Sequence, residues 1–259
     1  AGGGMAPVGD VCATAEAITG GSVSAQLVVN GTTVGYTNDY TGVSQSNCYG
    51  TSGRDRVYSV SLAPNARVLA SIRQAATGTL NDPSINLVVG PEAQCSAMPR
   101  VCVAGDDNGG ATTVNAVRYI NPSSSTQTVF ILADSFSATD TGGAFRLDVS
   151  VDNPAAGDAC ESPIVLMSGT PRTGEALTGF ANDYFDRSGA GSGCAVSTAS
   201  NGVDRAYSVL VGAGETMVVT VTPSAGLDTA INLHGDAAEC LGRSCVTSSN
   251  TGAAGAVDT

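Results

Sequence analysis

The sequence predicts an all-β protein made of two tandem antiparallel β-sandwich domains of the jelly-roll type. Three observations predict this class: apolar residues that alternate with polar ones along short segments, an internal repeat, and eight cysteines in 259 residues. Each domain is expected to contain two disulfides, and the second is expected to lack its last strands.

Alternation with a period of two is the signal for strands. Apolar residues occupy every second position over residues 145–151, 58–62 and 217–221. Such segments bury one face and leave the other in water. Further strands are expected over residues 25–29, 67–73, 85–89, 116–120 and 128–133. A single short helix is expected near residues 13–18.

An internal repeat relates the two halves of the chain. Residues 9–12, Gly-Asp-Val-Cys, recur as Gly-Asp-Ala-Cys at 157–160, and residues 55–60 recur almost unchanged at 204–209. Similarity of this kind indicates a repeated structural unit. We therefore expect an N-terminal extension (1–8), a first sandwich (9–152) and a second, incomplete sandwich (153–259).

The cysteines divide evenly between the repeats, and four cysteines allow three pairings. We expect one long and one short bridge in each repeat. The expected pairs are Cys12–Cys48, Cys95–Cys102, Cys160–Cys194 and Cys240–Cys245. An even number of cysteines in a glycine-rich chain without lysine favours an oxidising compartment, and so a secreted or cell-surface location.

The second repeat ends early by comparison with the first. The first continues past residue 117 through three expected strands, whereas the second reaches Thr259 where the first of these would begin. A sandwich without its last strands exposes open sheet edges. Three explanations are considered: the natural chain continues, a strand from a neighbouring subunit completes the sheet, or the second unit closes differently.

Composition and motifs argue against several functions. The formal net charge is -12, whereas a nucleic-acid interface needs a basic surface. No run of about 18 apolar residues is present, so no membrane insertion is expected. His234 is the only histidine, no G-x-S-x-G motif occurs, and the absence of lysine excludes a phosphate-binding loop of the G-x-x-x-x-G-K type. We therefore predict that the protein is not an enzyme.

One segment offers metal chemistry. Asp106, Asp107 and Asn108 follow a glycine in a turn-rich stretch. Calcium prefers about six to eight oxygen ligands of the kind that these side chains carry. The competing explanation is that the same residues form Asx-turns. Calcium is the one cofactor that the sequence suggests.

The order of the motifs resembles the bacterial pre-peptidase C-terminal domain, in the cysteine-containing tandem form of exported myxobacterial proteins. The motifs lie at residues 55–62, 82–87, 95–107, 128–134 and 145–149. The resemblance implies a non-catalytic jelly-roll β-sandwich associated with export, and some relatives bind calcium or matrix polymers. The second repeat departs from it, because Ser249, Asn250 and Thr251 replace the acidic segment.

Together these observations predict a non-catalytic structural or adhesive module of a secreted or cell-surface bacterial protein. One form of it is a subunit of an extracellular filament, a homo-oligomer completed by a neighbouring strand. The alternative is a calcium- or polymer-binding accessory module of a secreted hydrolase. The expected partners are other protein subunits or extracellular polymers.

Overall fold

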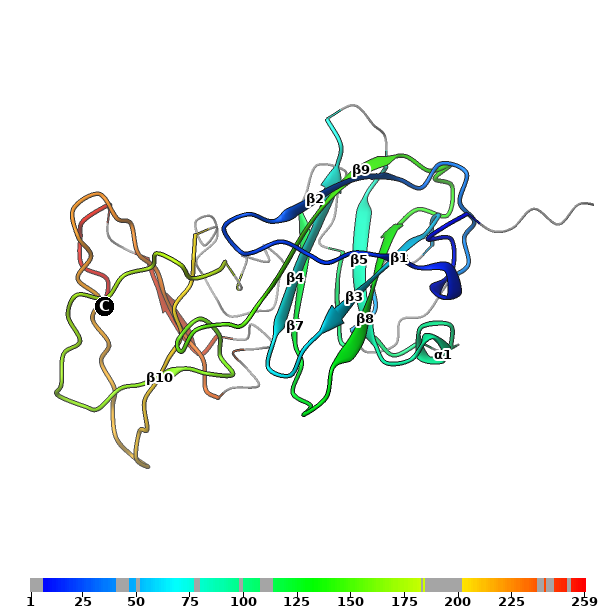
Figure 1. The fold of residues 1–259 in the computed structure, drawn as a ribbon. Coiled ribbons are helices and arrows are strands. Elements are labelled where there is room, and N and C mark those ends of the chain that lie inside the picture. The colour runs from blue at the N-terminus through cyan, green and yellow to red at the C-terminus, as the bar shows by residue number, and fades with distance from the viewer. Residues whose placement is uncertain are drawn as a thin grey trace, which may run out of the picture. The chain divides into compact units, whose positions relative to one another are not determined.

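The computed structural model describes residues 7–40, 47–49, 52–76, 80–97, 100–107, 114–182, 184, 202–236, 240, 245–250 and 253–259. These residues form β-strands joined by turns and contain almost no helix, which confirms the predicted all-β class. The chain divides into two compact units, unit 1 (Ala1–Asn153) and unit 2 (Pro154–Thr259). Each unit is described by itself (Figure 1).

Unit 1 contains two sheets (Figure 1). The five-stranded sheet has the order β1 (Glu16–Ala17), β3 (Arg56–Leu62), β8 (Gln127–Ser135), β5 (Pro83–Val89) and β6 (Ala104–Asp106). The four-stranded sheet has the order β2 (Leu27–Thr32), β9 (Ala144–Asp152), β4 (Arg67–Gln74) and β7 (Asn115–Ile120). Every pairing in these two sheets is antiparallel except that of β1 with β3, which is parallel.

The main core of unit 1 lies between the two sheets. Its side chains come from alternate positions of the strands, as the period of two predicts. Tyr58 of β3 meets Phe145 of β9 edge to face, with ring centroids 6.4 Å apart. The other fully buried side chains of this core include Leu62, Ile72, Leu80, Ile85, Leu87, Ile131 and Leu147.

The outer face of the five-stranded sheet is buried as well. Val57, Val88, Phe130 and Leu132 form a second apolar cluster there with Tyr40 and all four cysteines of unit 1. Strand β8 is therefore covered on both faces, which explains why residues 129–133 are apolar at every position rather than at every second one.

Short elements provide this cover, and they are the ones that the sequence predicted least well. The helix expected near residues 13–18 is a 3₁₀ helix, η1 (Cys12–Thr14), followed by β1. Helix α1 (Glu92–Cys95) and strand β6 were not expected. Elements of two to four residues contain too few positions for a periodic pattern, so packing alone determines them.

The described residues of unit 2 form two separate two-stranded sheets. Strand β10 (Ile164–Val165) pairs in parallel with β11 (Tyr207–Ser208), and β12 (Ile231–Leu233) pairs antiparallel with β13 (Thr247–Ser249). Of the strand expected over residues 217–221, only an isolated bridge from Val221 to Asp258 is formed. The tandem arrangement of two sandwiches, of which the second lacks its last strands, therefore stays a prediction.

No helix within the described part of the chain combines the length and the apolar character that crossing a membrane requires.

Candidate functional site

The disulfides of unit 1 lie on the outer face of the five-stranded sheet, and the candidate functional groups surround them. Cys12 of η1 bonds to Cys95 of α1, and Cys48 bonds to Cys102. In unit 2, Cys160 bonds to Cys240. The predicted pairs Cys12–Cys48, Cys95–Cys102 and Cys240–Cys245 are therefore wrong. The predicted pair Cys160–Cys194 is wrong as well, because Cys160 bonds to Cys240. Cys194 lies outside the described residues, and Cys245 is also disulfide-bonded.

The physical reason for this correction is the covering layer, that is, η1, α1 and the segments that place Tyr40 and Cys48 on the outer face of the five-stranded sheet. Cys95 and Cys102 belong to the connection between β5 and β6, whose ends are already held together by the pairing of those two strands. A bridge between them would add little constraint. Each instead joins a covering segment from elsewhere in the chain, over separations of 83 and 54 residues. On the chain-entropy estimate, such bridges stabilise the fold by about 4 to 4.5 kcal/mol each.

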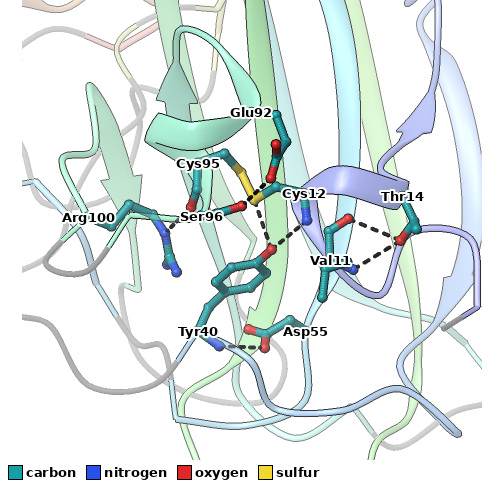
Figure 2. The surroundings of a disulfide bond; sticks show 9 residues. All are labelled: Val11, Cys12, Thr14, Tyr40, Asp55, Glu92, Cys95, Ser96 and Arg100. Atoms are coloured by element: carbon teal, nitrogen blue, oxygen red, sulfur yellow. Dashed lines mark hydrogen bonds between the residues drawn. A yellow bond between two sulfur atoms is a disulfide. The ribbon is translucent and has the colours of Figure 1, made fainter. Parts of the chain in front are cut away.

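Tyr40 connects the first disulfide to the sheet (Figure 2). Its hydroxyl accepts a hydrogen bond from the backbone N–H of Cys12 at 2.5 Å and lies 2.8 Å from the Cys12 Sγ. The ring is 4% exposed, and burial raises the pKa of its hydroxyl to about 12. The phenol is therefore neutral at physiological pH and acts as a hydrogen-bonding group.

Two buried carboxyl groups lie beside Tyr40. Asp55, directly before β3, accepts the backbone N–H groups of Asp39 and Tyr40 through Oδ2 at 2.7 and 3.1 Å. Asp134, near the end of β8, accepts the N–H of Ser135 through Oδ1 at 2.6 Å. Both side chains are fully buried, and they hydrogen-bond to each other.

A hydrogen bond between two carboxyl groups requires that one of them be protonated. Two oxygens of the pair, Asp55 Oδ1 and Asp134 Oδ2, are buried and have no hydrogen-bond partner while both groups are ionised. Burial raises the pKa of both groups, and the neighbouring Asp55 raises the pKa of Asp134 further. A pair that shares one proton carries one negative charge and gives both of these oxygens a partner.

Arg100 balances that charge. It is 2% exposed, and burial lowers the pKa of its guanidinium, while its electrostatic interactions with Tyr40, Asp55 and Asp134 oppose that shift. Its guanidinium lies 4.1 Å from the centroid of the Tyr40 ring, and its Nε donates to the carbonyl of Cys95 at 3.0 Å (Figure 2). One arginine thus joins the carboxyl pair, the aromatic ring and the disulfide in a single network, here called the buried polar network.

The buried polar network has the composition of a reactive site but not its accessibility. Two carboxyl groups that share a proton can act as acid and base where a substrate reaches them. Here Asp55, Asp134, Arg100 and Tyr40 are at most 4% exposed. Their hydrogen bonds go to backbone groups of the covering segments and to each other. The arrangement can therefore hold the covering layer against the sheet.

Unit 2 repeats part of this network. The Tyr184 hydroxyl accepts the N–H of Cys160 at 2.6 Å, and Asp204 Oδ2 accepts the N–H of Tyr184 at 2.9 Å. These residues align with Tyr40, Cys12 and Asp55 of unit 1. The repeat signal in the sequence therefore marked Asp55 and Asp204, although it did not identify Asp134 as a partner.

The predicted calcium ligands divide into described and undescribed residues. Asp106 is 5% exposed, and its Oδ2 accepts the N–H of Ala116 at 2.8 Å, which is a structural use. Asp107 lies beside it, and Asn108 lies outside the described residues. Within the described ranges no group of three or more histidine, cysteine or acidic residues is arranged to hold a metal ion. Calcium binding stays a prediction.

A surface hollow of unit 1 also bears on ligand binding. It has a volume of about 450 Å³ and is lined in part by Tyr36, Arg54, Thr139 and Asp140. The Tyr36 ring is already stacked by the Arg56 guanidinium, 5.1 Å from its centroid.

The fold and the buried polar network define a disulfide-held β-sandwich. A scan against protein-family models finds no match, and a search of curated proteins finds no significant one. Among solved structures, the chain is similar to the pre-peptidase C-terminal domain of a collagenase from Bacillus anthracis. That likeness has a TM-score of 0.30 and 14% sequence identity, over 53% of this chain and 94% of that domain.

Proposed function

We propose that the protein is a non-catalytic structural module of an exported protein, stabilised by disulfides. The observation that carries the proposal is that the potentially reactive groups of unit 1 are buried and bind other parts of the same fold. The carboxyl pair, Arg100, Tyr40 and the four cysteines of unit 1 are all at most 5% exposed, and together they fix the covering layer to the sheet. They leave no titratable group of the network in contact with solvent.

The contribution of the disulfides to the stability of the fold supports export. The Cys12–Cys95, Cys48–Cys102 and Cys160–Cys240 disulfides join segments 83, 54 and 80 residues apart. Bridges of this kind persist in oxidising compartments and are reduced in the cytosol. A fold that depends on them for about 4 kcal/mol each belongs in the former. An adhesive or assembling role is a finer form of the same proposal.

Limited proteolysis combined with activity assays tests this function. The oxidised chain is digested before and after reduction, and we expect unit 1 to resist protease only when oxidised. The same protein is assayed on peptide, ester and glycoside substrates beside its Asp134→Asn variant. Hydrolysis by the wild-type chain that the variant loses would overturn the proposal, as would a reduced chain that resists protease equally well.

A further inference from the structure

The surface hollow of unit 1 lies where three connecting segments meet at one end of the sandwich. These segments are residues 33–38 after β2, residues 52–55 before β3 and residues 136–143 between β8 and β9. The volume of about 450 Å³ falls within the range of about 300 to 1,000 Å³ that ligand pockets occupy. Loops held on a rigid sheet commonly carry binding residues, so this hollow is a candidate ligand site.

Hydrogen bonds fix the three segments to the sheets and to one another. The N–H of Gly53 donates to the carbonyl of Ser135 at 2.8 Å. The N–H of Thr33 donates to the carbonyl of Gly143 at 3.0 Å, and the N–H of Gly143 donates to Thr33 Oγ1 at 3.1 Å. The walls of the hollow are therefore preorganised, which lowers the entropy cost of binding a ligand.

Two glycines allow the segments to approach this closely. A Cβ added to Gly53 would collide with the side chain of Ser135. Gly142 has a φ of +93°, and a Cβ there would lie 2.8 Å from the carbonyl oxygen of Thr33. A side chain at either position would push the walls apart, so the shape of the hollow depends on these residues.

Arg54 is the cation in the lining of this hollow. Its half-buried side chain forms no hydrogen bond or ion pair with the residues that the structure describes. By contrast, four other arginines of unit 1 each pair with a carboxylate, namely Arg56, Arg67, Arg73 and Arg146. The Arg54 guanidinium is therefore available to an anion from outside the chain.

The sequence repeat shows that the shared fold does not require this cation. Residues 55–60 recur almost unchanged at 204–209, whereas Val203 stands at the position of Arg54. An arginine that supported the sheet or its covering layer would be expected in both repeats. Its presence in unit 1 alone favours a role in binding.

Neutral polar groups and one fixed carboxylate accompany Arg54 in the hollow. Asn38, Thr139 and Thr141 contribute exposed amide and hydroxyl groups to the lining. Asp140 accepts backbone N–H groups through both carboxylate oxygens, at 2.9 and 3.1 Å, so its position is fixed. Each of these oxygens keeps a lone pair that a ligand hydroxyl can occupy. The hollow thus combines a donor for a carboxylate with donors and acceptors for hydroxyl groups.

We propose that this hollow binds an acidic sugar, a uronic acid residue of an extracellular polysaccharide. Its carboxylate would lie on the Arg54 guanidinium, which can donate two parallel hydrogen bonds to it. Its ring hydroxyls would lie on Asp140 and on the threonines of the lining. This inference adds a ligand to the proposed structural role.

Isothermal titration calorimetry of the oxidised full chain with trigalacturonic acid tests the proposal. The fully methyl-esterified trimer is the matched control, because it keeps the rings and hydroxyls but has no charge for Arg54. We expect saturable binding of the acid and binding of the ester at least about tenfold weaker, since a charge-assisted pair is lost. Absence of binding, or equal binding of the ester, would overturn the proposal.

A pair of variants with the same change in net charge locates the site. Arg54→Val introduces the residue of the second repeat, so it should fold, and it should weaken binding of the acid at least about tenfold. Arg172→Gln changes a surface arginine of unit 2, whose side chain is 43% exposed, and should leave binding unchanged. Equal weakening by both variants would show attraction by net charge alone and would contradict a site at Arg54.

The peptide trialanine, with its free terminal carboxylate, checks the class of ligand. Binding of this peptide as tight as that of trigalacturonic acid would overturn the assignment to a sugar. Failure of any of these binding tests leaves the structural role standing, because the proteolysis and activity assays address that role separately.

Discussion

Asp55, directly before β3, and Asp134, near the end of β8, form a contact between two carboxyl groups that are both fully buried. The contact is possible only because β3 and β8 are neighbours, with Arg56 opposite Ala133. It requires a proton that the unfolded chain releases at an ordinary carboxyl pKa, so the stability of unit 1 depends on pH through this contact.

The first prediction concerns the direction of that dependence. The folded pKa of the pair is raised, so its stabilising contribution is complete below the unfolded carboxyl pKa of about 3.9 and is lost as pH rises through the folded value. We expect the contribution of this pair to the free energy of unfolding to fall above pH 4, by at most about 1.4 kcal/mol per pH unit for one proton. Urea denaturation at a series of pH values measures it.

Asp134→Asn should remove this dependence, because the amide donates to Asp55 without a titrating proton and still accepts from Ser135. The variant should be at least as stable as the wild type at pH 8. Glu92→Gln, which alters an exposed carboxyl on α1, serves as the control and should keep the wild-type slope. A wild-type slope in Asp134→Asn would show that the pair does not hold the proton.

A second prediction concerns the Tyr40 hydroxyl. Tyr40→Phe leaves the ring in place but removes the acceptor of the Cys12 N–H, which is then buried without a partner. We expect a loss of about 1 to 3 kcal/mol in the free energy of unfolding. Tyr49→Phe is the matched control, because Tyr49 is 46% exposed and should change stability by less than about 0.5 kcal/mol. Equal losses would contradict this role for the hydroxyl.

A third prediction concerns the disulfide pairing. Peptide mapping without reduction should recover fragments joined by Cys12–Cys95 and by Cys48–Cys102. Replacing both Cys12 and Cys95 by alanine should lower the free energy of unfolding by about 4 kcal/mol, while the second bridge still forms. Recovery of a Cys95–Cys102 fragment would show that the bridges instead close within the β5–β6 connection.

The strands that the sequence predicted correctly are those with a long pattern. Residues 128–133 and 145–151 lie within β8 and β9 because six or seven residues of β-branched and apolar character are enough to specify a strand. Two-residue β1 has no such pattern and exists because Glu16 and Ala17 pair in parallel with Tyr58 and Ser59. Its position follows from tertiary packing, which a single sequence does not record.

The candidate site shows the same division. The repeat drew attention to Asp55, which interacts electrostatically with Arg100 in the structure. Its contact with Asp134 was missed, because the two residues are far apart in sequence. Only the antiparallel pairing of β3 with β8 brings the start of β3 next to the end of β8. The disulfides were assigned wrongly for a related reason. The prediction paired cysteines that are close in sequence, whereas the packing of the covering layer on the sheet brings distant cysteines together.

A fourth prediction concerns the ion pair at the start of β4. The Arg67 guanidinium is fully buried and donates to both carboxylate oxygens of Asp152, at 3.0 and 2.7 Å. Arg67→Met should cost about 3 kcal/mol, because it leaves a carboxylate without its cation. Arg146→Met is the control: its side chain is 40% exposed, so we expect a loss of at most about 1 kcal/mol by thermal denaturation. Similar losses would mean that burial of Arg67 contributes nothing.

The last prediction separates the two explanations for the acidic turn after β6. Burial, with smaller contributions from Asp82 and Asp106, raises the pKa of Asp107 to about 6. Stability arising from this carboxyl is therefore lost as pH rises from about 4 to 6, and Asp107→Asn should not show that loss. A bound calcium ion would favour the carboxylate and lower this pKa. Because Asp106 already accepts the Ala116 N–H, we expect millimolar calcium to leave the pKa unchanged in an NMR titration. A downward shift that Asp107→Asn abolishes would establish the calcium site instead.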